Sequence, residues 1–135
     1  MFQGVFAPIP TPFMDDAIDA RALFQNLKRW EKTRLAGVVV LGSNGEFVLL
    51  TREEKEALID LVRQHFTPDK KVIAGTGCES TKETISRTRR AAALGADAAL
   101  VINPSYYKNA RRRTRWWLTP HPSPCCCITC RQTPG

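Results

Sequence analysis

Four short apolar runs alternate along the chain with segments in which apolar side chains recur every three or four positions. Runs of this kind, bounded by Gly, Pro and polar residues, are typical of buried strands. They lie at residues 5–9, 38–41, 72–74 and 98–102. The periodic segments begin at residues that commonly cap helices, namely Asp19, Thr51 and Ser80. The pattern therefore predicts four strands joined by three helices.

The predicted helices carry further signals at their ends and on one face. Thr51 with Glu54, and Ser80 with Glu83, have the spacing of a capping box. Gly95 is placed to end the third helix. The side chains expected to face the core are Leu23, Leu27 and Trp30 in the first helix, Leu58, Leu61 and Val62 in the second, and Ile85, Ala92 and Leu94 in the third.

The spacing of the strands predicts an α/β fold with parallel pairing. Strands that begin near residues 38, 72 and 98 are each separated by one helix, which gives repeated βα units with right-handed crossovers. Four strands and three helices correspond to the N-terminal half of a (β/α)8 TIM barrel, but a small open doubly wound sheet has the same element order. The order of the strands in space stays open between these two.

The charge pattern divides the chain near Tyr107. Residues 1–107 hold 14 basic and all 13 acidic residues, whereas residues 108–135 hold six basic residues and no acidic ones. Four of the five cysteines also lie after residue 107. Because this basic, Cys- and Pro-rich tail lacks helix or strand periodicity, it is predicted to be disordered. Its composition is typical of a frameshifted or misjoined reading, so residues 1–107 form the predicted globular part.

The segment Gly42-Ser43-Asn44-Gly45-Glu46 follows the second predicted strand directly. The carboxyl ends of parallel strands are where α/β proteins place their ligand sites. The two glycines allow a sharp turn with exposed N–H groups, and Ser43 and Asn44 add short hydrogen-bond donors. Such a loop suits a small carboxylate, although an ordinary connection between strand and helix has a similar composition.

Four segments of the chain, taken together, resemble a known enzyme family. They are Gly4-Val5 through Thr11-Pro12-Phe13, Gly42 to Glu46, Gly75-Thr76-Gly77, and Asn103-Pro104-Ser105-Tyr106-Tyr107. In this order and spacing they resemble the dihydrodipicolinate synthase and N-acetylneuraminate lyase superfamily of pyruvate-dependent class I aldolases. The Ser43-Asn44 pair with Phe47 is most similar to the 4-hydroxy-2-oxoglutarate aldolase branch.

The resemblance implies a TIM barrel in which a lysine forms a Schiff base with a keto acid such as pyruvate. Ser43 and Asn44 match the positions that bind the substrate carboxylate, and Ser43 also matches a hydroxyl of the proton relay. Tyr106 matches the catalytic tyrosine of that relay, with Tyr107 as the alternative. The resemblance further implies a lyase without metal or organic cofactor, and a homo-oligomer. A cytoplasmic location is expected by default, because the start of the chain has neither the pattern of a signal peptide nor an Arg-rich amphipathic leader.

The chain departs from this family in its lysines. The Schiff-base lysine should follow in a later strand, and none of the seven lysines present matches it. They are Lys28, Lys32, Lys55, Lys70, Lys71, Lys82 and Lys108. Such a lysine needs a desolvated pocket that lowers its pKa toward neutrality. We therefore expect the 135 residues to be catalytically inactive.

Other readings of single segments are weaker. Gly75-Thr76-Gly77 lacks the third glycine of a dinucleotide fingerprint. Glu46 could act as a base, and is better suited to accept backbone N–H bonds near a helix start.

The tail suggests an alternative function. Arginines there lie next to Trp116 and Trp117 in the sequence, and this combination is typical of RNA binding. The alternative is therefore a small α/β module that contacts RNA through its tail. The crowded tail cysteines disfavour a metal site, and no apolar run is long enough to span a membrane.

Overall fold

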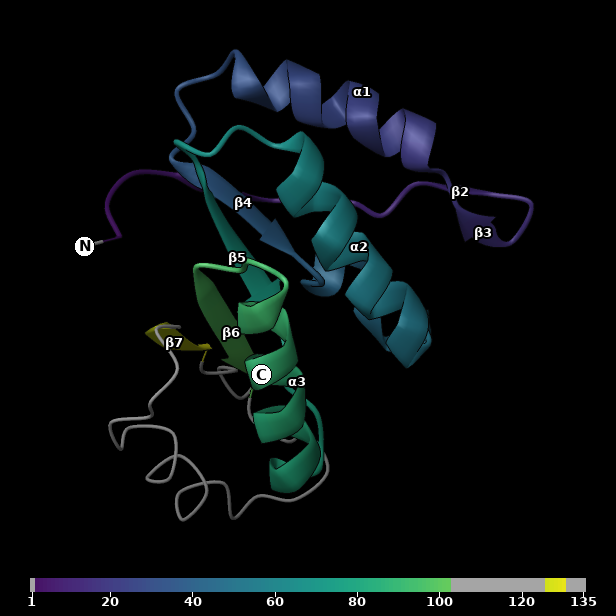
Figure 1. Ribbon diagram of the computed structural model, residues 1–135, viewed down its shortest axis with the longest axis vertical. Helices are drawn as coiled ribbons and strands as arrows, with labels where there is room; N and C mark the ends of the chain where they lie inside the picture. Colours follow the sequence, from purple (N-terminus) through teal and green to yellow (C-terminus); the bar gives the residue numbers. More distant parts are fainter. Residues whose placement is uncertain (1, 103–125, 131–135) are drawn as a thin grey trace, which may run out of the picture.

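The computed structural model describes residues 2–102 and 126–130. Its main feature is one parallel sheet in which the strands lie in the order β1-β4-β5-β6-β7 (Figure 1). The strands are β1 (Phe6–Pro8), β4 (Gly37–Val40), β5 (Lys71–Gly75), β6 (Ala98–Ile102) and β7 (Cys126–Cys130). Each of the first four therefore pairs with the next one along the chain.

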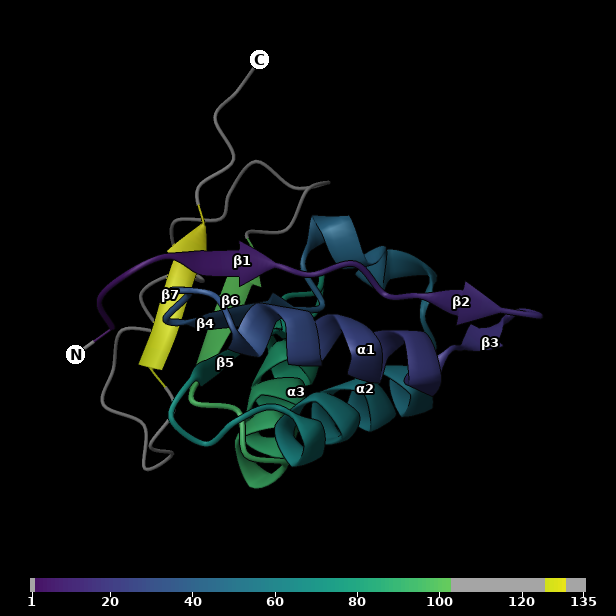
Figure 2. The same cartoon turned by 90° about the horizontal axis from the view of Figure 1, so that it is seen from above.

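This strand order decides between the two architectures that the sequence leaves open. A doubly wound sheet reverses its strand order near the middle, whereas a barrel keeps the sequence order around its wall. The order β1-β4-β5-β6 shows no reversal, so the prediction of a partial TIM barrel is confirmed. The helices are α1 (Ala20–Glu31), α2 (Arg52–His65) and α3 (Thr81–Ala93), and Figure 2 shows them side by side along one face of the sheet.

The predicted helix starts are confirmed by their hydrogen bonds. The Asp19 carboxylate accepts the N–H groups of Arg21 and Ala22 at the start of α1. Thr51 and Glu54 form both bonds of a capping box. At the start of α3 only half of the predicted box is present, because Ser80 accepts the N–H of Glu83 while the Glu83 carboxylate pairs with Arg87.

The core lies between the helices and the sheet. Its members are apolar side chains from all three helices and from the strands, namely Ile9, Leu23, Leu27, Val38, Val40, Leu41, Leu50, Leu58, Ile59, Val62, Phe66, Val72, Ala74, Ala91 and Ala96. The predicted faces of α1 and α2 are confirmed by the burial of Leu23, Leu27, Leu58 and Val62.

The predicted face of α3 is shifted from the observed one. The buried residues of this helix are Thr84, Thr88 and Ala91. Ile85 and Ala92 are only half-buried. The two threonines are buried because their hydroxyls find partners: Thr88 bonds to Thr76, and Thr84 donates to the Ser80 carbonyl. A hydrogen bond offsets the free-energy cost of burying a hydroxyl. A prediction based on the spacing of apolar residues does not identify such buried threonines.

The amino end of the sheet is held by Arg63. Its guanidinium donates to the carbonyls of Phe66 and Thr67 at 2.9 Å and of Lys70 at 3.3 Å. The same group pairs with the Asp97 carboxylate at 3.6 Å. Arg63 therefore joins the end of α2 to the loop before β5 and to the residue that precedes β6.

A small hairpin was not predicted. Strands β2 (Phe13–Met14) and β3 (Ala17–Ile18) pair antiparallel. The two residues between them, Asp15 and Asp16, have φ values of 51° and 58°. Positive φ at both positions is the geometry of a two-residue hairpin turn, and Asp tolerates it better than most residues.

Strand β7 lies within the predicted tail, residues 108–135, and pairs in parallel with all five residues of β6. The outer edge of β6 is therefore paired over this length. An uncovered strand edge presents unpaired N–H and C=O groups, which any extended segment can satisfy.

Within the described residues, no helix is long and apolar enough to cross a bilayer.

Candidate functional site

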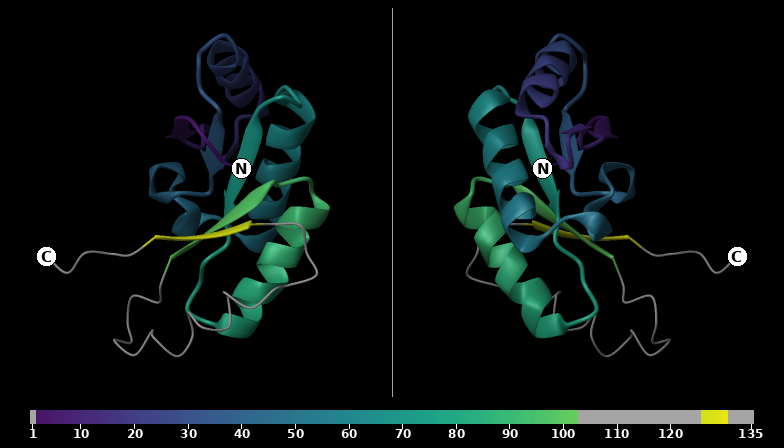
Figure 3. Two further views of the ribbon diagram at one scale, coloured as in Figure 1. Left: turned by 90° about the vertical axis from the view of Figure 1, so that its left-hand side faces the viewer. Right: turned by 90° about the vertical axis from the view of Figure 1, so that its right-hand side faces the viewer.

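The candidate site is the loop Gly42–Glu46, hereafter the 42–46 loop, at the carboxyl end of β4. Its central residues form a short 3₁₀ helix, η1 (Ser43–Gly45), and a second one, η2 (Phe47–Leu49), follows before α2. Figure 3 shows the turns after β4, in blue-teal, on the opposite side of the sheet from α2 and α3. In a barrel that face is the interior, where ligands reach the strand ends.

Two residues in left-handed conformation bracket this loop. Leu41 has φ = 60° and Glu46 has φ = 52°. Side chains with a Cβ rarely adopt these values, because the Cβ crowds the neighbouring backbone. Such strain persists only where the surrounding structure enforces it, and it concentrates at functional sites.

The neighbouring strand makes room for the first of these residues. A Cβ at Gly75 would collide with the Leu41 carbonyl. Gly77, two residues later, likewise lies against the backbone of Ile102, 2.7 Å from its nitrogen if a Cβ is added. These glycines therefore permit close approach of adjacent strand ends. That packing role accounts for Gly75-Thr76-Gly77 without a nucleotide.

A second contact fixes the loop from the segment after β1. The Thr11 hydroxyl donates a buried hydrogen bond of 2.8 Å to the Gly45 carbonyl. A Cβ at Gly45 would stand 3.1 Å from the Ile9 carbonyl oxygen and 3.2 Å from the Thr11 hydroxyl. The loop and the segment 9–11 are thus closely packed, and a glycine at position 45 gives them space.

The structure brings Ser43 and Asn44 together at the surface of this loop. Both side chains are exposed, and the Ser43 hydroxyl donates to Asn44 Oδ1 at 3.4 Å. In the part of the chain that the structure describes, their backbone N–H groups have no acceptor, because the bonds of η1 start at Gly45 and Glu46. A hydroxyl, an amide and two free N–H groups together can receive one carboxylate.

The other predicted site residues have different outcomes. Tyr106 and its alternative Tyr107 lie outside the described residues. Glu46 was predicted to accept backbone N–H bonds, but its exposed carboxylate has no hydrogen bond to any described residue. Glu46 instead contributes its left-handed backbone conformation to the loop. The sequence did not predict this conformation or the contact of Thr11 with the loop. The one sequence signal for Thr11 is its position between Pro10 and Pro12, which indicates a conformationally restricted segment.

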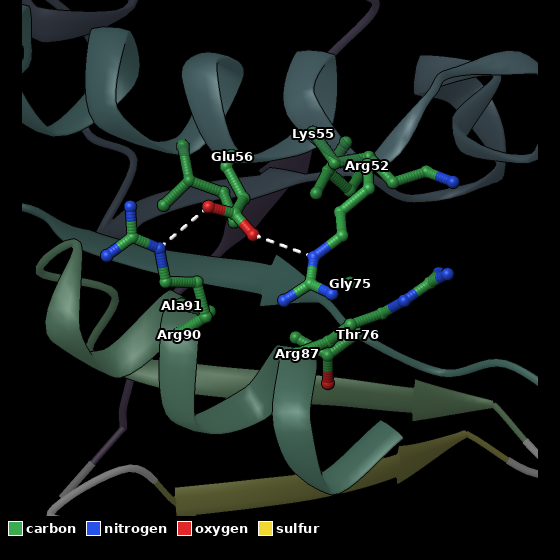
Figure 4. Close-up of a pocket in the computed structure, with 10 residues that line it drawn as sticks. Arg52, Lys55, Glu56, Gly75, Thr76, Arg87, Arg90 and Ala91 are labelled. Atoms are coloured by element: carbon green, nitrogen blue, oxygen red, sulfur yellow. Dashed lines mark hydrogen bonds and ion pairs between the residues drawn. The ribbon is translucent and has the colours of Figure 1, made fainter. Parts of the chain in front are cut away.

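A separate, partly open hollow lies between α2 and α3 on the helix side (Figure 4). At its rim Glu56 bridges two cations, Arg90 at 2.7 Å and Arg52 at 3.1 Å. These guanidinium groups, Arg90 first, hold the pKa of the Glu56 carboxylate below its usual value. Burial lowers the pKa of Lys55, and the neighbouring Arg87 lowers it further. The paired charges tie α2 to α3.

The lysines of the described residues do not gather at the 42–46 loop. Lys70 donates to the Trp30 and Thr33 carbonyls, and Lys71 pairs with Asp97 at 2.7 Å, so both lie at the amino end of the sheet. Lys28 pairs with Glu31 on α1. Lys55 is at the hollow on the opposite side of the sheet.

Comparison with known proteins identifies the family. A model of the dihydrodipicolinate synthetase family matches residues 1–115. The chain belongs to this family. Among curated relatives, the 4-hydroxy-tetrahydrodipicolinate synthase of Methanothrix thermoacetophila is 44% identical over 114 residues, which are 84% of this chain and 38% of that protein. The chain thus spans about two fifths of the length of the relatives it matches, and the resemblance to the superfamily is confirmed.

Solved structures of the family have the same fold. Dihydrodipicolinate synthase from Aquifex aeolicus superposes with a TM-score of 0.81 at 34% identity, covering 87% of this chain and 41% of that one. YagE, a prophage protein of the family from Escherichia coli crystallised with pyruvate, superposes with a TM-score of 0.80 at 32% identity, covering 86% and 41%. The α/β arrangement described above is therefore that of these barrels over part of their length.

Proposed function

We propose that the 42–46 loop binds the carboxylate of a pyruvate-like keto acid, as the substrate-binding part of a Schiff-base aldolase. The observation that carries this proposal is the adjacency of Ser43 and Asn44 on a strained loop at the carboxyl end of β4. Among the described residues, their backbone N–H groups have no acceptor. The pyruvate complex of YagE supports a ligand of this class within the family.

The roles proposed for the residues are those that the family resemblance implies, and their chemistry is consistent with them. The Asn44 amide and the Ser43 hydroxyl donate to the two carboxylate oxygens. The Ser43 hydroxyl also passes a proton to or from the tyrosine of the relay, for which we propose Tyr106 with Tyr107 as the alternative. A phenol with a pKa near 10 and a serine hydroxyl can transfer a proton between them in a site shielded from water.

The Schiff base needs an amine in a desolvated pocket beside the keto carbon. The described lysines lie on the helices or at the amino end of the sheet, as shown above. We therefore propose that the 135 residues alone do not carry out the aldol step. Formation of a borohydride-trappable adduct between this chain and pyruvate would contradict that proposal.

The branch of the family is a further proposal. Ser43-Asn44 followed by Phe47, which packs half-buried against the core, favours a 4-hydroxy-2-oxoglutarate aldolase. The names of the curated relatives favour 4-hydroxy-tetrahydrodipicolinate synthase as the second candidate. The two candidates can be distinguished with a protein in which this chain is joined to the remaining strands of the barrel. Cleavage of 4-hydroxy-2-oxoglutarate supports the first, and formation of 4-hydroxy-tetrahydrodipicolinate supports the second.

Other attributes come to this chain from the family. We propose a homo-oligomeric, cytoplasmic lyase that uses no metal or organic cofactor. The alternative of an RNA-binding module has no support among the relatives, and the basic segment on which it rests lies outside the described residues. The family match extends to residue 115, past the start of the predicted tail.

Binding of pyruvate to the chain tests the central proposal. In an NMR titration with pyruvate, the amide signals of residues 42–46 should shift, and Ser43→Ala or Asn44→Ala should each weaken binding about tenfold, the value of one charge-assisted hydrogen bond. Asn26→Ala, on α1, is the matched control and should bind as the unmodified chain does. Equal binding by Ser43→Ala, Asn44→Ala and the control would overturn the proposal.

A further inference from the structure

We propose that Thr11 is a positioning residue for the keto-acid site, acting through the Gly45 carbonyl. This inference rests on the proposed function of the 42–46 loop and extends it to a residue that touches no substrate. The hydroxyl of Thr11 holds the Gly45 carbonyl and thereby fixes the position of the neighbouring Ser43 and Asn44.

Thr11 supplies the long-range hydrogen bond of this loop. Within the described residues, the other bonds of the loop are local. They join Gly45 to Gly42, Glu46 to Ser43, Leu49 to Glu46, and the side chains of Ser43 and Asn44. The bond from Thr11 to the Gly45 carbonyl spans 34 positions in sequence and is buried. Local bonds preserve the shape of a turn, and only a distant contact can set its orientation relative to the sheet.

The segment that carries Thr11 is itself fixed at both ends. Ile9 extends the ladder beyond β1 by donating its N–H to the Val39 carbonyl at 3.0 Å. On the other side, the Pro12 carbonyl accepts the N–H of Asp19 at 2.9 Å. The prolines at positions 10 and 12 restrict φ on either side of Thr11. Thr11 therefore stands on a rigid support between β4 and the start of α1.

The opposite face of the contact is equally constrained. Gly45 has space for no more than a tight Cβ, 3.1 Å from the Ile9 carbonyl oxygen and 3.2 Å from the Thr11 hydroxyl. The loop also begins after a left-handed Leu41 and ends in a left-handed Glu46. A turn strained at both ends relaxes toward other conformations unless an outside contact opposes this, and the Thr11 hydroxyl supplies that contact.

Isosteric variants separate this role from ordinary packing. Thr11→Val keeps the β-branched shape and removes the hydroxyl, whereas Thr11→Ser keeps the hydroxyl and removes a methyl group. Thr88→Val is the matched control. Thr88 and Thr11 are each 8% exposed, and each hydroxyl makes a buried 2.8 Å hydrogen bond, but that of Thr88 joins α3 to Thr76 and makes no bond to the 42–46 loop.

Two measurements on the 135-residue chain test the proposal. Amide hydrogen exchange at Gly45 and Glu46 reports loop order without ligand, and an NMR titration with pyruvate reports binding. Thr11→Val should speed exchange at both amides and weaken pyruvate binding about tenfold, the value of one lost hydrogen bond. Thr11→Ser should retain both properties. Thr88→Val should lower thermal stability and leave both properties unchanged.

The possible outcomes distinguish this inference from the proposed function. If the unmodified chain binds no pyruvate while Thr11→Val still loosens the loop, the proposed function fails and the positioning contact stands. If pyruvate binds the Thr11→Val chain as tightly as the unmodified chain, the inference fails and the proposed function stands. Equal rates of amide hydrogen exchange at Gly45 and Glu46 in Thr11→Val and Thr88→Val would also overturn the inference.

A second variant keeps the test valid if Thr11→Val does not fold. Gly45→Ala approaches the same contact from the loop side, because its methyl group presses on the Ile9 carbonyl and the Thr11 hydroxyl. It should speed exchange at Glu46 and weaken pyruvate binding by a similar factor. Unchanged exchange and unchanged binding in Gly45→Ala would overturn the inference.

Discussion

The Leu41 carbonyl lies directly against Gly75, so closely that a Cβ at position 75 would collide with it. The carboxyl end of β4 is thus shaped by a residue of β5. Because the 42–46 loop begins immediately after Leu41, its starting direction depends on the neighbouring strand as well as on its own sequence. This relationship makes Gly75 the first residue to test.

Gly75→Ala should destabilise the fold by about 1–3 kcal/mol, the usual cost of overpacking, since the added methyl group must displace backbone. Urea denaturation measures this change. Gly42→Ala is the control, because its Cβ would meet nothing closer than the Val39 methyl group at 3.9 Å and its φ is −81°. Equal stability of the two variants would show that the close contact of Leu41 with Gly75 is relieved without cost.

Replacing Glu46 by Gly should stabilise the chain. Glu46 has φ = 52°, and its carboxylate bonds to no described residue, so glycine removes strain and loses no contact. After the entropy cost of glycine, we expect a gain of about 0.5–1 kcal/mol in the free energy of unfolding. Glu46→Ala should give no such gain, because it retains the Cβ. A gain of equal size in both variants would place the effect in the carboxylate charge.

Arg63 should not tolerate replacement by Lys. Its guanidinium donates to three carbonyls at once and pairs with Asp97, whereas an ammonium cannot reproduce this planar set of donors. We expect Arg63→Lys to lower the free energy of unfolding by about 2 kcal/mol, because partly buried carbonyls lose their donors. Arg89→Lys, at an exposed position on α3, should change it by less than about 0.5 kcal/mol.

Glu56 should give the fold part of its acid sensitivity. Arg90 and Arg52 hold the pKa of its carboxylate below the ordinary value of 4.5, so its contribution is present above that pH and is lost as the pH falls through the lower, folded value. The group is partly exposed, so the contribution should stay below about 1 kcal/mol.

Urea denaturation between pH 7 and pH 3 measures this contribution. Glu56→Gln should reduce stability at pH 7 and flatten the fall in stability below pH 4.5. Glu53→Gln is the control, because Glu53 lies on the same helix and forms no ion pair within the described residues. A pH profile of Glu56→Gln that parallels the unmodified chain would exclude a stabilising role for the bridge.

Local signals predicted the elements well. Asp19, Thr51 and Ser80 start helices where expected, because a side-chain cap depends only on residues within one turn. The face of α3 was predicted less well, because Thr84 and Thr88 are buried through hydrogen bonds to the 76–80 segment. The hairpin at Asp15 and Asp16 was missed because its signal is a backbone preference without apolar periodicity.

The residues of the candidate site also fall into those that local sequence indicates and those that depend on distant contacts. Gly42, Ser43 and Asn44 could be selected from the sequence, since their types and their place after a strand indicate a donor-rich turn. Thr11 and Gly75 could not, because each acts on the loop from a segment distant in the chain, Thr11 from the segment after β1 and Gly75 from β5. Thr11 and Gly45 are 34 positions apart in the sequence, so the residues around either one do not indicate their hydrogen bond.

The sequence by itself determined the alternation of strands and helices, the helix caps and the position of the donor-rich turn, because these depend on periodicity and on neighbours within a few residues. Only the tertiary structure decided the strand order, the pairing of β7 with β6, the left-handed conformations of Leu41 and Glu46, and the contact of Thr11 with Gly45. The physical reason is that these features arise from packing between segments far apart in the chain, where no local preference selects one partner over another.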